Sequence, residues 1–309
     1  MFPRVVQNEP VEPVTPWGPG PVPAFPEEWD SRQVLRLLLE AGRIGLSRYH
    51  AAAWELKADG TLVTEADRRI EGLLAAELDC PARGAYTIGE ETIAARGREY
   101  TAAALRGNTW VVDPIDGTAP YAHGLPTWGT SIGLMRGGVL TAGAIILPAL
   151  GEVFLYDGNR LLWADGVSLG APTPPRLRPL VPQVRPFTRG GMIALGQDMA
   201  KHGRFSGGNP VYASGCAIVA LAYLLLGRFA GYIATLKLWD LAGCLPMLAH
   251  AGYEMVLLDG RALRTSLDPD LYVLDPDSPA AWSLKGTAVF APPGVASVLR
   301  HLSRRDEGQ

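Results

Sequence analysis

Apolar residues recur at the spacing of an amphipathic helix in two segments near the start of the chain. The first segment runs from about residue 30 to residue 49, and the second opens at Thr64 and continues through residue 78. One stripe of the first segment holds Leu35, Leu38, Leu39, Gly42 and Leu46. Between the segments, Asp59-Gly60 is a dipeptide that favours a sharp turn. The pattern therefore predicts two helices connected through a tight turn.

Short apolar runs bounded by turn residues follow, and they indicate β-strands. We expect strands over residues 85–88, 109–112, 128–135, 139–147 and 153–156. Gly-Gly and Leu-Gly pairs separate the last three runs, as they do between antiparallel neighbours. Residues 165–190 are rich in proline and predict a long connection.

The second half of the chain alternates between strand and helix patterns. We expect strands over residues 192–195, 231–234, 253–258 and 287–290, and helices over 214–226, 241–251 and 294–302. Pro246 falls inside the second of these helices and should kink it. The order of elements predicts a mixed α/β fold with two layered halves, residues 27–190 and 191–309, behind a proline-rich arm, residues 1–26.

Composition limits the class of protein. Of the 309 residues 48% are apolar, which excludes a mostly disordered chain, although 36 glycines and 26 prolines at first suggest disorder. Many of these prolines lie in the arm and in the 165–190 connection, so the suggestion of disorder is confined to the arm. The 28 basic residues nearly balance the 31 acidic ones, which argues against nucleic acid as a main partner.

Cysteine usage and hydropathy indicate where the protein works. The three cysteines lie far apart with no CxxC pair, so we expect a reduced, cytoplasmic location. The N-terminus lacks the apolar run of a signal peptide. The longest apolar stretch, residues 217–226, is half the length that a bilayer crossing needs, so we expect no membrane association.

The most informative motif is Asp113-Pro114-Ile115-Asp116-Gly117-Thr118, which follows an apolar strand. Proline and glycine force a tight turn that can aim both carboxylates and a backbone carbonyl into one small volume. Mg²⁺ prefers such all-oxygen ligation. Amides at the start of a helical turn after Gly117 could then bind phosphate. The alternative is a plain strand-ending turn; an EF-hand loop does not fit, because position 124 is Gly.

Three further acidic positions are ambiguous when each is taken alone. Glu90-Glu91 could be a solvated loop after a strand. Asp67 follows Thr64 by three residues and could serve only as part of a helix capping box. Asp240 could be the N-cap of the helix that we expect from residue 241.

Taken together, the acidic segments resemble the inositol monophosphatase family. These are Mg²⁺-dependent, lithium-sensitive phosphatases grouped with fructose-1,6-bisphosphatases and 3′-phosphonucleotide phosphatases. The matching segments are KADGTLVTEAD (57–67), IGEET (88–92), WVVDPIDGT (110–118) with HGLP and TSIGL behind it, and LWDLAG (238–243). Order and spacing agree throughout. The resemblance implies a layered αβαβα sandwich and a homodimer.

The resemblance also implies metal ligands at the matching positions. Glu90 and Asp113, with the Ile115 carbonyl, would hold a first Mg²⁺. Asp113, Asp116 and Asp240 would hold a second, so that two or three ions occupy the site. Carboxylates this crowded stay ionised only with cations between them.

Catalytic roles follow from the same resemblance. Thr118 and Glu90 would orient the attacking water, with Asp67 supporting Thr118. The Gly117 and Thr118 amides would bind the phosphate. His123 in the HGLP turn is expected to be structural.

The substrate side departs from the family pattern. Ser214, Gly215 and Cys216 occupy the place of the family's Arg-x-x-Gly-Ser/Thr-Ala segment, and we expect them to line the pocket. The family places a substrate-binding glutamate six residues before Trp239, where this chain has Ile233. Loss of that charged acceptor predicts that inositol phosphate is not the preferred substrate.

The expected activity is hydrolysis of a small phosphate monoester. Inositol phosphate, another sugar or polyol phosphate, histidinol phosphate and a 3′-phosphonucleotide all remain candidate substrates. A catalytically silent regulatory homologue is the non-enzymatic alternative, although the expected ligands are all present.

Overall fold

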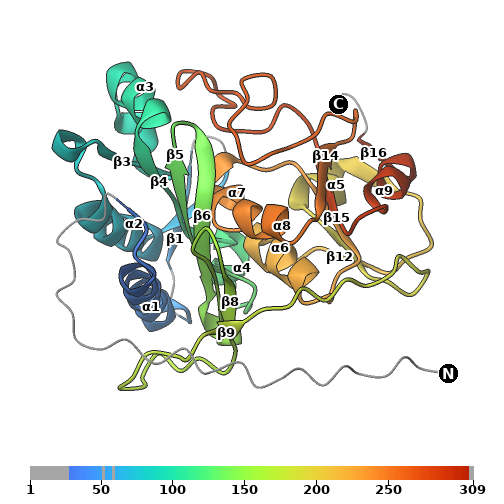
Figure 1. The fold of residues 1–309 in the computed structure, drawn as a ribbon, viewed down its shortest axis with the longest axis horizontal. Coiled ribbons are helices and arrows are strands. Elements are labelled where there is room, and N and C mark those ends of the chain that lie inside the picture. The colour runs from blue at the N-terminus through green and yellow to red at the C-terminus, as the bar shows by residue number, and fades with distance from the viewer. Residues whose placement is uncertain (1–27, 51–52, 58–59, 306–309) are drawn as a thin grey trace.

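The computed structural model of the chain describes residues 28–50, 53–57 and 60–305 (Figure 1). The proline-rich arm predicted for residues 1–26, and Asp59 of the predicted turn, lie outside the described residues.

Two long helices form the first layer, as the apolar stripes predict. Helix α1 (Ser31–Arg48) follows Asp30, whose carboxylate accepts a hydrogen bond from the Arg32 amide at 2.8 Å. Helix α2 (Glu65–Leu78) follows Thr64 as its N-cap. A hairpin of β1 (Trp54–Leu56) and β2 (Leu62–Thr64), which hydrophobic patterning did not predict, precedes α2.

A seven-stranded sheet lies against these helices, with its strands in chain order. Its members are β3 (Ala85–Gly89), β4 (Asn108–Asp116), β5 (Gly129–Arg136), β6 (Val139–Leu147), β7 (Glu152–Tyr156), β8 (Leu161–Ala164) and β9 (Arg178–Pro179). Strands β3 and β4 are parallel, and every other pair is antiparallel. The five predicted strands are confirmed, whereas β9 lies inside the segment predicted to be a plain connection.

The second sheet has five strands in the order β12-β10-β13-β15-β14. Its members are β10 (Ile193–Leu195), β12 (Val211–Tyr212), β13 (Gly231–Ala234), β14 (Glu254–Leu257) and β15 (Ala288–Ala291). A separate pair joins β11 (Gly203–Phe205) to β16 (Ser303–Arg305). The remaining α-helices are α3 (Arg98–Arg106), α4 (Thr118–Ala122), α5 (Gln197–His202), α6 (Ala217–Leu225), α7 (Leu238–Ala242), α8 (Leu245–His250) and α9 (Ala296–Leu302). The short 3₁₀ helices are η1 (Pro81–Arg83), η2 (Ile93–Ala95) and η3 (Pro148–Leu150).

Pro246 does not kink a helix, as the sequence pattern had suggested. The predicted helix over 241–251 is instead two short helices, α7 and α8, and Pro246 is the second residue of α8. Amides in the first turn of a helix have no intrahelical acceptor, so proline is tolerated there.

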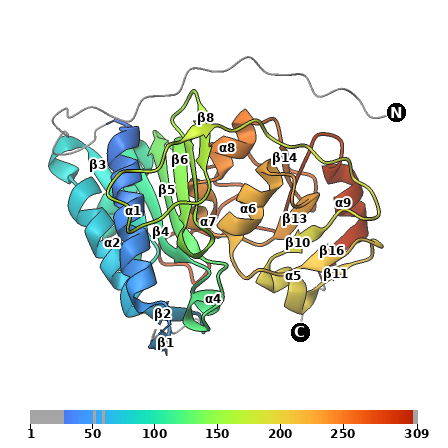
Figure 2. The same cartoon turned by 90° about the horizontal axis from the view of Figure 1, so that it is seen from below.

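The layers alternate in the order helix, sheet, helix, sheet, helix (Figure 2). Helices α1 and α2 cover one face of the large sheet, and α6, α7 and α8 fill the space between the two sheets. Helix α9 packs on the outer face of the small sheet. This arrangement confirms the expected αβαβα sandwich. Because both sheets contribute to one apolar cluster, a division of the chain near residue 190 stays a prediction.

No helix in the described ranges is long and apolar enough to cross a bilayer.

Candidate functional site

A cleft of about 560 Å³ opens where β4 ends and α7 begins. Most of the residues predicted for the site line this cleft. The predicted residues among the lining are Glu90, Asp113, Ile115, Asp116, Gly117, Thr118, Gly215 and Asp240. This volume falls within the range of about 300–1,000 Å³ common for small-molecule sites. We call it the acidic cleft.

A break in β4 aims two carboxylates at the acidic cleft. Asp113 pairs with Ser131 and Asp116 with Gly129, so β4 holds one more residue than β5 between these pairs. Pro114 has no amide to donate, and its carbonyl accepts a hydrogen bond from Thr130 Oγ1 at 2.8 Å. Side chains alternate along a strand, and the extra residue brings positions three apart to one face.

Asp113 is a buried carboxylate with an unsatisfied oxygen. Within the described part of the chain, its Oδ1 has no hydrogen-bond partner. Burial raises the pKa of Asp113 well above its usual range, and the charges of Glu90, Asp116 and Asp240 raise it further. An ionised carboxylate in this position therefore requires a cation nearby.

Asp116 caps the helix that separates the two sheets. Its Oδ1 accepts from the Ala217 amide at 3.0 Å, and its Oδ2 accepts from the Ile218 amide at 2.6 Å. Burial raises the pKa of Asp116 to about 6, although the two amides favour the charged form.

Asp240 reaches the acidic cleft from α7. It was expected as the N-cap of a helix starting at residue 241, but α7 starts at Leu238 and Asp240 is its third residue. Its Oδ2 accepts from the Lys237 amide at 2.8 Å. Burial, followed by the charge of Asp116, raises the pKa of Asp240 well above its usual range.

Glu90 and Glu91 are paired with a lysine. Lys57 Nζ lies 3.0 Å from Glu90 Oε1 and 2.6 Å from Glu91 Oε1. Burial opposes the charge on Lys57, but the two carboxylates outweigh it and raise the pKa of the ammonium group. The loop is thus not a freely solvated one.

Glu71 on α2 supports this loop and was missed in the sequence. Its carboxylate is fully buried and accepts from the Glu91 and Thr92 amides, each at 2.8 Å. A Cβ at Gly89 would clash with the Glu71 carboxylate, so a larger residue there would displace this carboxylate from its amide partners. Glu71 follows Asp67 by four residues on one face of the helix, a spacing that could have revealed it.

Asp67 lies between the start of α2 and Thr118. Its Oδ2 accepts from the Thr64 amide at 2.8 Å, which confirms the capping box, and its Oδ1 lies 3.4 Å from Thr118 Oγ1. Thr118 Oγ1 also lies 3.0 Å from the Ile115 carbonyl oxygen. Burial raises the pKa of Asp67 to about 7.

The donor set suits a hard divalent cation, although the side chains do not surround one. Among the described residues, no three Asp, Glu, His or Cys side chains are positioned to hold one ion together. Glu90 contacts Lys57, and Asp116 contacts the α6 amides. The unsatisfied Asp113 oxygen, the oxygen-only donors and their mutual repulsion nevertheless fit Mg²⁺.

Of the three residues expected at the substrate side, Gly215 lines the acidic cleft. Ser214 Oγ donates to the Cys216 carbonyl at 2.9 Å, so this hydroxyl serves the turn before α6. Cys216 is buried behind Gly117. Ile233 points away from the acidic cleft into the core beneath α9.

Seven further polar residues of the acidic cleft lie outside the motifs found in the sequence. They are Gln197, Asp198, Lys201, Thr235, Lys237, Ser283 and Arg305. They come from α5, the segment between β13 and α7, the loop before β15, and β16, so no single local motif contains them.

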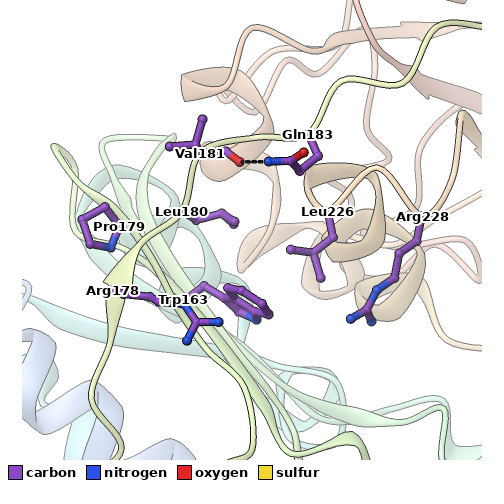
Figure 3. Close-up of a pocket in the computed structure, with 8 residues that line it drawn as sticks. All are labelled: Trp163, Arg178, Pro179, Leu180, Val181, Gln183, Leu226 and Arg228. Atoms are coloured by element: carbon purple, nitrogen blue, oxygen red, sulfur yellow. Dashed lines mark hydrogen bonds between the residues drawn. The ribbon is translucent and has the colours of Figure 1, made fainter. Parts of the chain in front are cut away.

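A second cavity, of about 490 Å³, lies away from the carboxylates (Figure 3). Trp163, Arg178 and Leu180 form one side, and Leu226 and Arg228 form the other. None of the predicted site residues lines it.

Comparisons with known proteins agree with the geometry. A model of the inositol monophosphatase family matches residues 32–288. An inositol-1-monophosphatase of Mesorhizobium japonicum is 31% identical over 214 residues, which cover 66% of this chain and 75% of that protein. A histidinol-phosphatase of Chlorobaculum parvum is 35% identical over 133 residues, covering 42% of this chain and 48% of that protein.

Solved structures show the same fold. An IMPase of Thermotoga maritima has a TM-score of 0.65 at 19% identity and covers 88% of this chain and 95% of its own. An IMPase/NADP phosphatase complexed with Mg²⁺ and phosphate has a TM-score of 0.59 at 15% identity, with 88% and 93% covered. The family match over most of the chain, together with this fold, shows that the chain belongs to the inositol monophosphatase family.

Proposed function

We propose that the protein hydrolyses the phosphate monoester of a small metabolite with the help of Mg²⁺. The observation that supports this most directly is the convergence of buried carboxylates in the acidic cleft, where Asp113 Oδ1 lacks a partner among the described residues. Relatives named as phosphatases support the same activity.

In this proposal Glu90, Asp113, Asp116, Asp240 and the Ile115 carbonyl hold two or three Mg²⁺. When bound, the ions neutralise the phosphate oxygens, lower the pKa of the attacking water and stabilise the leaving alkoxide. Hydrolysis of phosphate monoesters is otherwise among the slowest reactions in water.

The protein's own groups orient the water and the phosphate. With the Ile115 carbonyl used as a metal ligand, the Thr118 hydroxyl would donate its proton to Asp67 Oδ1, now 3.4 Å away, and its oxygen would accept a hydrogen bond from the water. The Glu90 carboxylate accepts the second proton of that water. Amides of Gly117 and Thr118 donate to the phosphate oxygens, and no covalent phospho-enzyme is needed.

Finer properties are proposed from family membership. We expect inhibition by Li⁺, a homodimer and a cytoplasmic location, and a small phosphorylated metabolite as the partner. The relatives include both inositol-1-monophosphatases and a histidinol-phosphatase, so the substrate class is left to measurement.

The test is a phosphate-release panel with and without Mg²⁺. It covers inositol 1-phosphate, sugar phosphates, histidinol phosphate and a 3′-phosphonucleotide. We expect release that requires Mg²⁺ and stops with EDTA, and we expect inositol 1-phosphate not to rank first. No release from any ester would refute the proposed function, and inositol 1-phosphate ranking first would refute the substrate expectation alone.

A further inference from the structure

One wall of the acidic cleft carries cations that the phosphatase site does not use. It comes from α5, β16 and the segment after β13, and we call it the α5 wall: Gln197, Asp198, Lys201, Thr235, Lys237 and Arg305. Three of these residues are cationic and one is anionic. The wall thus has a net positive charge, in contrast to the carboxylates across the cleft.

Arg305 is held in a defined position. Its Nε lies 3.2 Å from Asp198 Oδ2, and its Nη2 lies 3.3 Å from Asp198 Oδ1. Asp198 Oδ2 also accepts from Thr235 Oγ1 at 3.0 Å, and Oδ1 contacts His202 Nδ1 at 3.2 Å. This two-point contact uses one edge of the guanidinium, so the Nη1 donors remain for a ligand.

The fold brings Arg305 to the site from near the end of the chain. Strand β16 pairs antiparallel with β11, and Arg305 lies opposite Gly203, directly after α5. Arg305 also lies beyond residues 32–288, the range that the family model matches. It is therefore a feature of this chain that the family match does not account for.

Lys201 adds a second, uncompensated charge. It lies one turn after Gln197 on α5, and both residues line the acidic cleft. Its side chain is exposed and forms no ion pair with any carboxylate of the described ranges. A cation fixed beside a cleft without a partner raises the local concentration of anions.

The same region lacks the acidic group that would favour a neutral polyol. Ile233, at the position of the family's glutamate, is buried in the core beneath α9 and does not reach the acidic cleft. The only carboxylate of the α5 wall, Asp198, is already engaged by Arg305 and Thr235. Donors therefore outnumber free acceptors on this wall.

We propose that Lys201 and Arg305 bind a second anionic group, a phosphate or a carboxylate, on the leaving group of the substrate. This inference rests on the proposed phosphatase function, because it describes the leaving group, the part of the substrate that remains after phosphate is removed. Charge-assisted hydrogen bonds of this kind combine affinity with discrimination against uncharged analogues.

The experiment compares substrates that differ only in the second group. Adenosine 3′,5′-bisphosphate is paired with adenosine 3′-phosphate, fructose 1,6-bisphosphate with fructose 1-phosphate, and 2-phosphoglycerate with glycerol 2-phosphate. Phosphate release with Mg²⁺ yields kcat/KM for each. We expect the doubly anionic member of at least one pair to be preferred by about tenfold or more. A preference in the first two pairs identifies a second phosphate, and one in the last pair identifies a carboxylate.

The variants Lys201→Gln, Arg305→Gln and their double substitution test the residues. We expect the double variant to lose the preference and to keep kcat/KM for the singly anionic esters. Arg304→Gln is the matched control, because Arg304 is exposed on the same strand and does not line the acidic cleft. Circular dichroism verifies that each variant is folded.

Two outcomes would overturn the second-anion site while leaving the phosphatase proposal intact. One is an equal kcat/KM for both members of every pair in the wild type. The other is an equal loss of kcat/KM for both members of a pair in the double variant. No Mg²⁺-dependent release from any of the esters would overturn both.

Discussion

Asp113 places a carboxylate in a buried position where Glu90, Asp116 and Asp240 surround it with like charge. A buried polar atom without a partner costs about 1–3 kcal/mol. In the metal-free protein this residue therefore opposes folding, and the proposed metal binding would offset that cost. At the scale of residues, the clustered carboxylates proposed to bind metal are also the groups that lower the stability of the metal-free protein.

Replacing Asp113 with Asn removes one charge while preserving shape. We expect Mg²⁺-dependent phosphate release to fall by at least about 100-fold, as it does when one electrostatic group is lost from a reacting centre. The melting temperature in EDTA should stay equal or rise, because repulsion decreases. Asp165→Asn, at an exposed aspartate, is the control. Wild-type-like turnover in Asp113→Asn would contradict the metal assignment.

Asp67 predicts a pH dependence of stability. Its pKa is raised by burial to about 7, whereas an unfolded aspartate has a pKa of about 3.9. Between these values the folded state binds more protons, so this carboxyl lowers the stability of the metal-free protein as pH rises from about 4 to about 7. The full difference corresponds to at most about 4 kcal/mol.

The Asp67→Asn substitution removes this titration. Urea unfolding in EDTA should show the variant gaining stability relative to the wild type between pH 5 and about pH 8. Activity should fall, because the amide can donate to Thr118 instead of accepting from it. Glu65→Gln, an exposed position on the same helix, is the control. A stability difference that does not change with pH would show that Asp67 titrates normally.

At the scale of elements, α2 acts as the support of the Glu90 loop. Thr64 and Asp67 start the helix, and one turn later Glu71 binds the amides of Glu91 and Thr92. The same helix packs its apolar face against the large sheet through Ile70 and other residues. The buried Glu71 carboxylate thus links the position of α2 to the position of the Glu90 loop.

The Glu71→Gln substitution separates the loop from the helix. One amide oxygen can satisfy only one of the two backbone donors in the same geometry. We expect the Mg²⁺ concentration for half-maximal activity to rise about tenfold, the effect common for groups that orient metal ligands. Glu77→Gln alters a partly exposed carboxylate on the same helix, which pairs with Arg36 and does not contact the Glu90 loop, and should leave this Mg²⁺ concentration unchanged. An unaltered Mg²⁺ requirement in Glu71→Gln would show that the loop holds its position without this contact.

At the scale of the whole molecule, the two sheets share one core. Phe154 of the large sheet and Tyr232 and Phe290 of the small sheet belong to the same apolar cluster as α6. Next to this core, Arg228 reaches Glu152 on β7 at 2.8 Å beside the cavity of Figure 3. Glu152 is 5% exposed, so the contact joins the large sheet to the segment after α6 through a buried carboxylate.

The Arg228→Met substitution tests this link. We expect a loss of about 1–3 kcal/mol in the free energy of unfolding, since a buried carboxylate loses its partner while the arginine is itself half exposed. Thermal unfolding followed by circular dichroism and by tryptophan fluorescence should show one transition, at a lower temperature, with both probes. Arg178→Met, whose partner Asp165 is exposed, should shift it less. Separate transitions for the two probes would show that the sheets unfold independently.

Patterning predicted the long helices and the central strands because their signals are local and repeated. It missed α3, α5 and β16, which are short or lack a clear apolar period. Around Pro246 the pattern predicted one helix, whereas the structure has α7 and α8 separated at Gly243, where a Cβ would lie 2.5 Å from Ser131 Oγ. This close packing of Gly243 on the large sheet is a tertiary feature that a local pattern does not contain.

The sequence by itself determined the features that depend on a few neighbouring residues: the Thr64–Asp67 capping box and the motifs that identify the family. The tight turn predicted after residue 112 is instead a bulge within β4, which continues to Asp116. Only the tertiary structure decided which distant residues share a surface. It brings Arg305 and Lys201 to the acidic cleft and buries Ile233 beneath α9. Local features follow from covalent geometry and short-range hydrogen bonds, whereas burial and juxtaposition arise when two sheets pack around common helices.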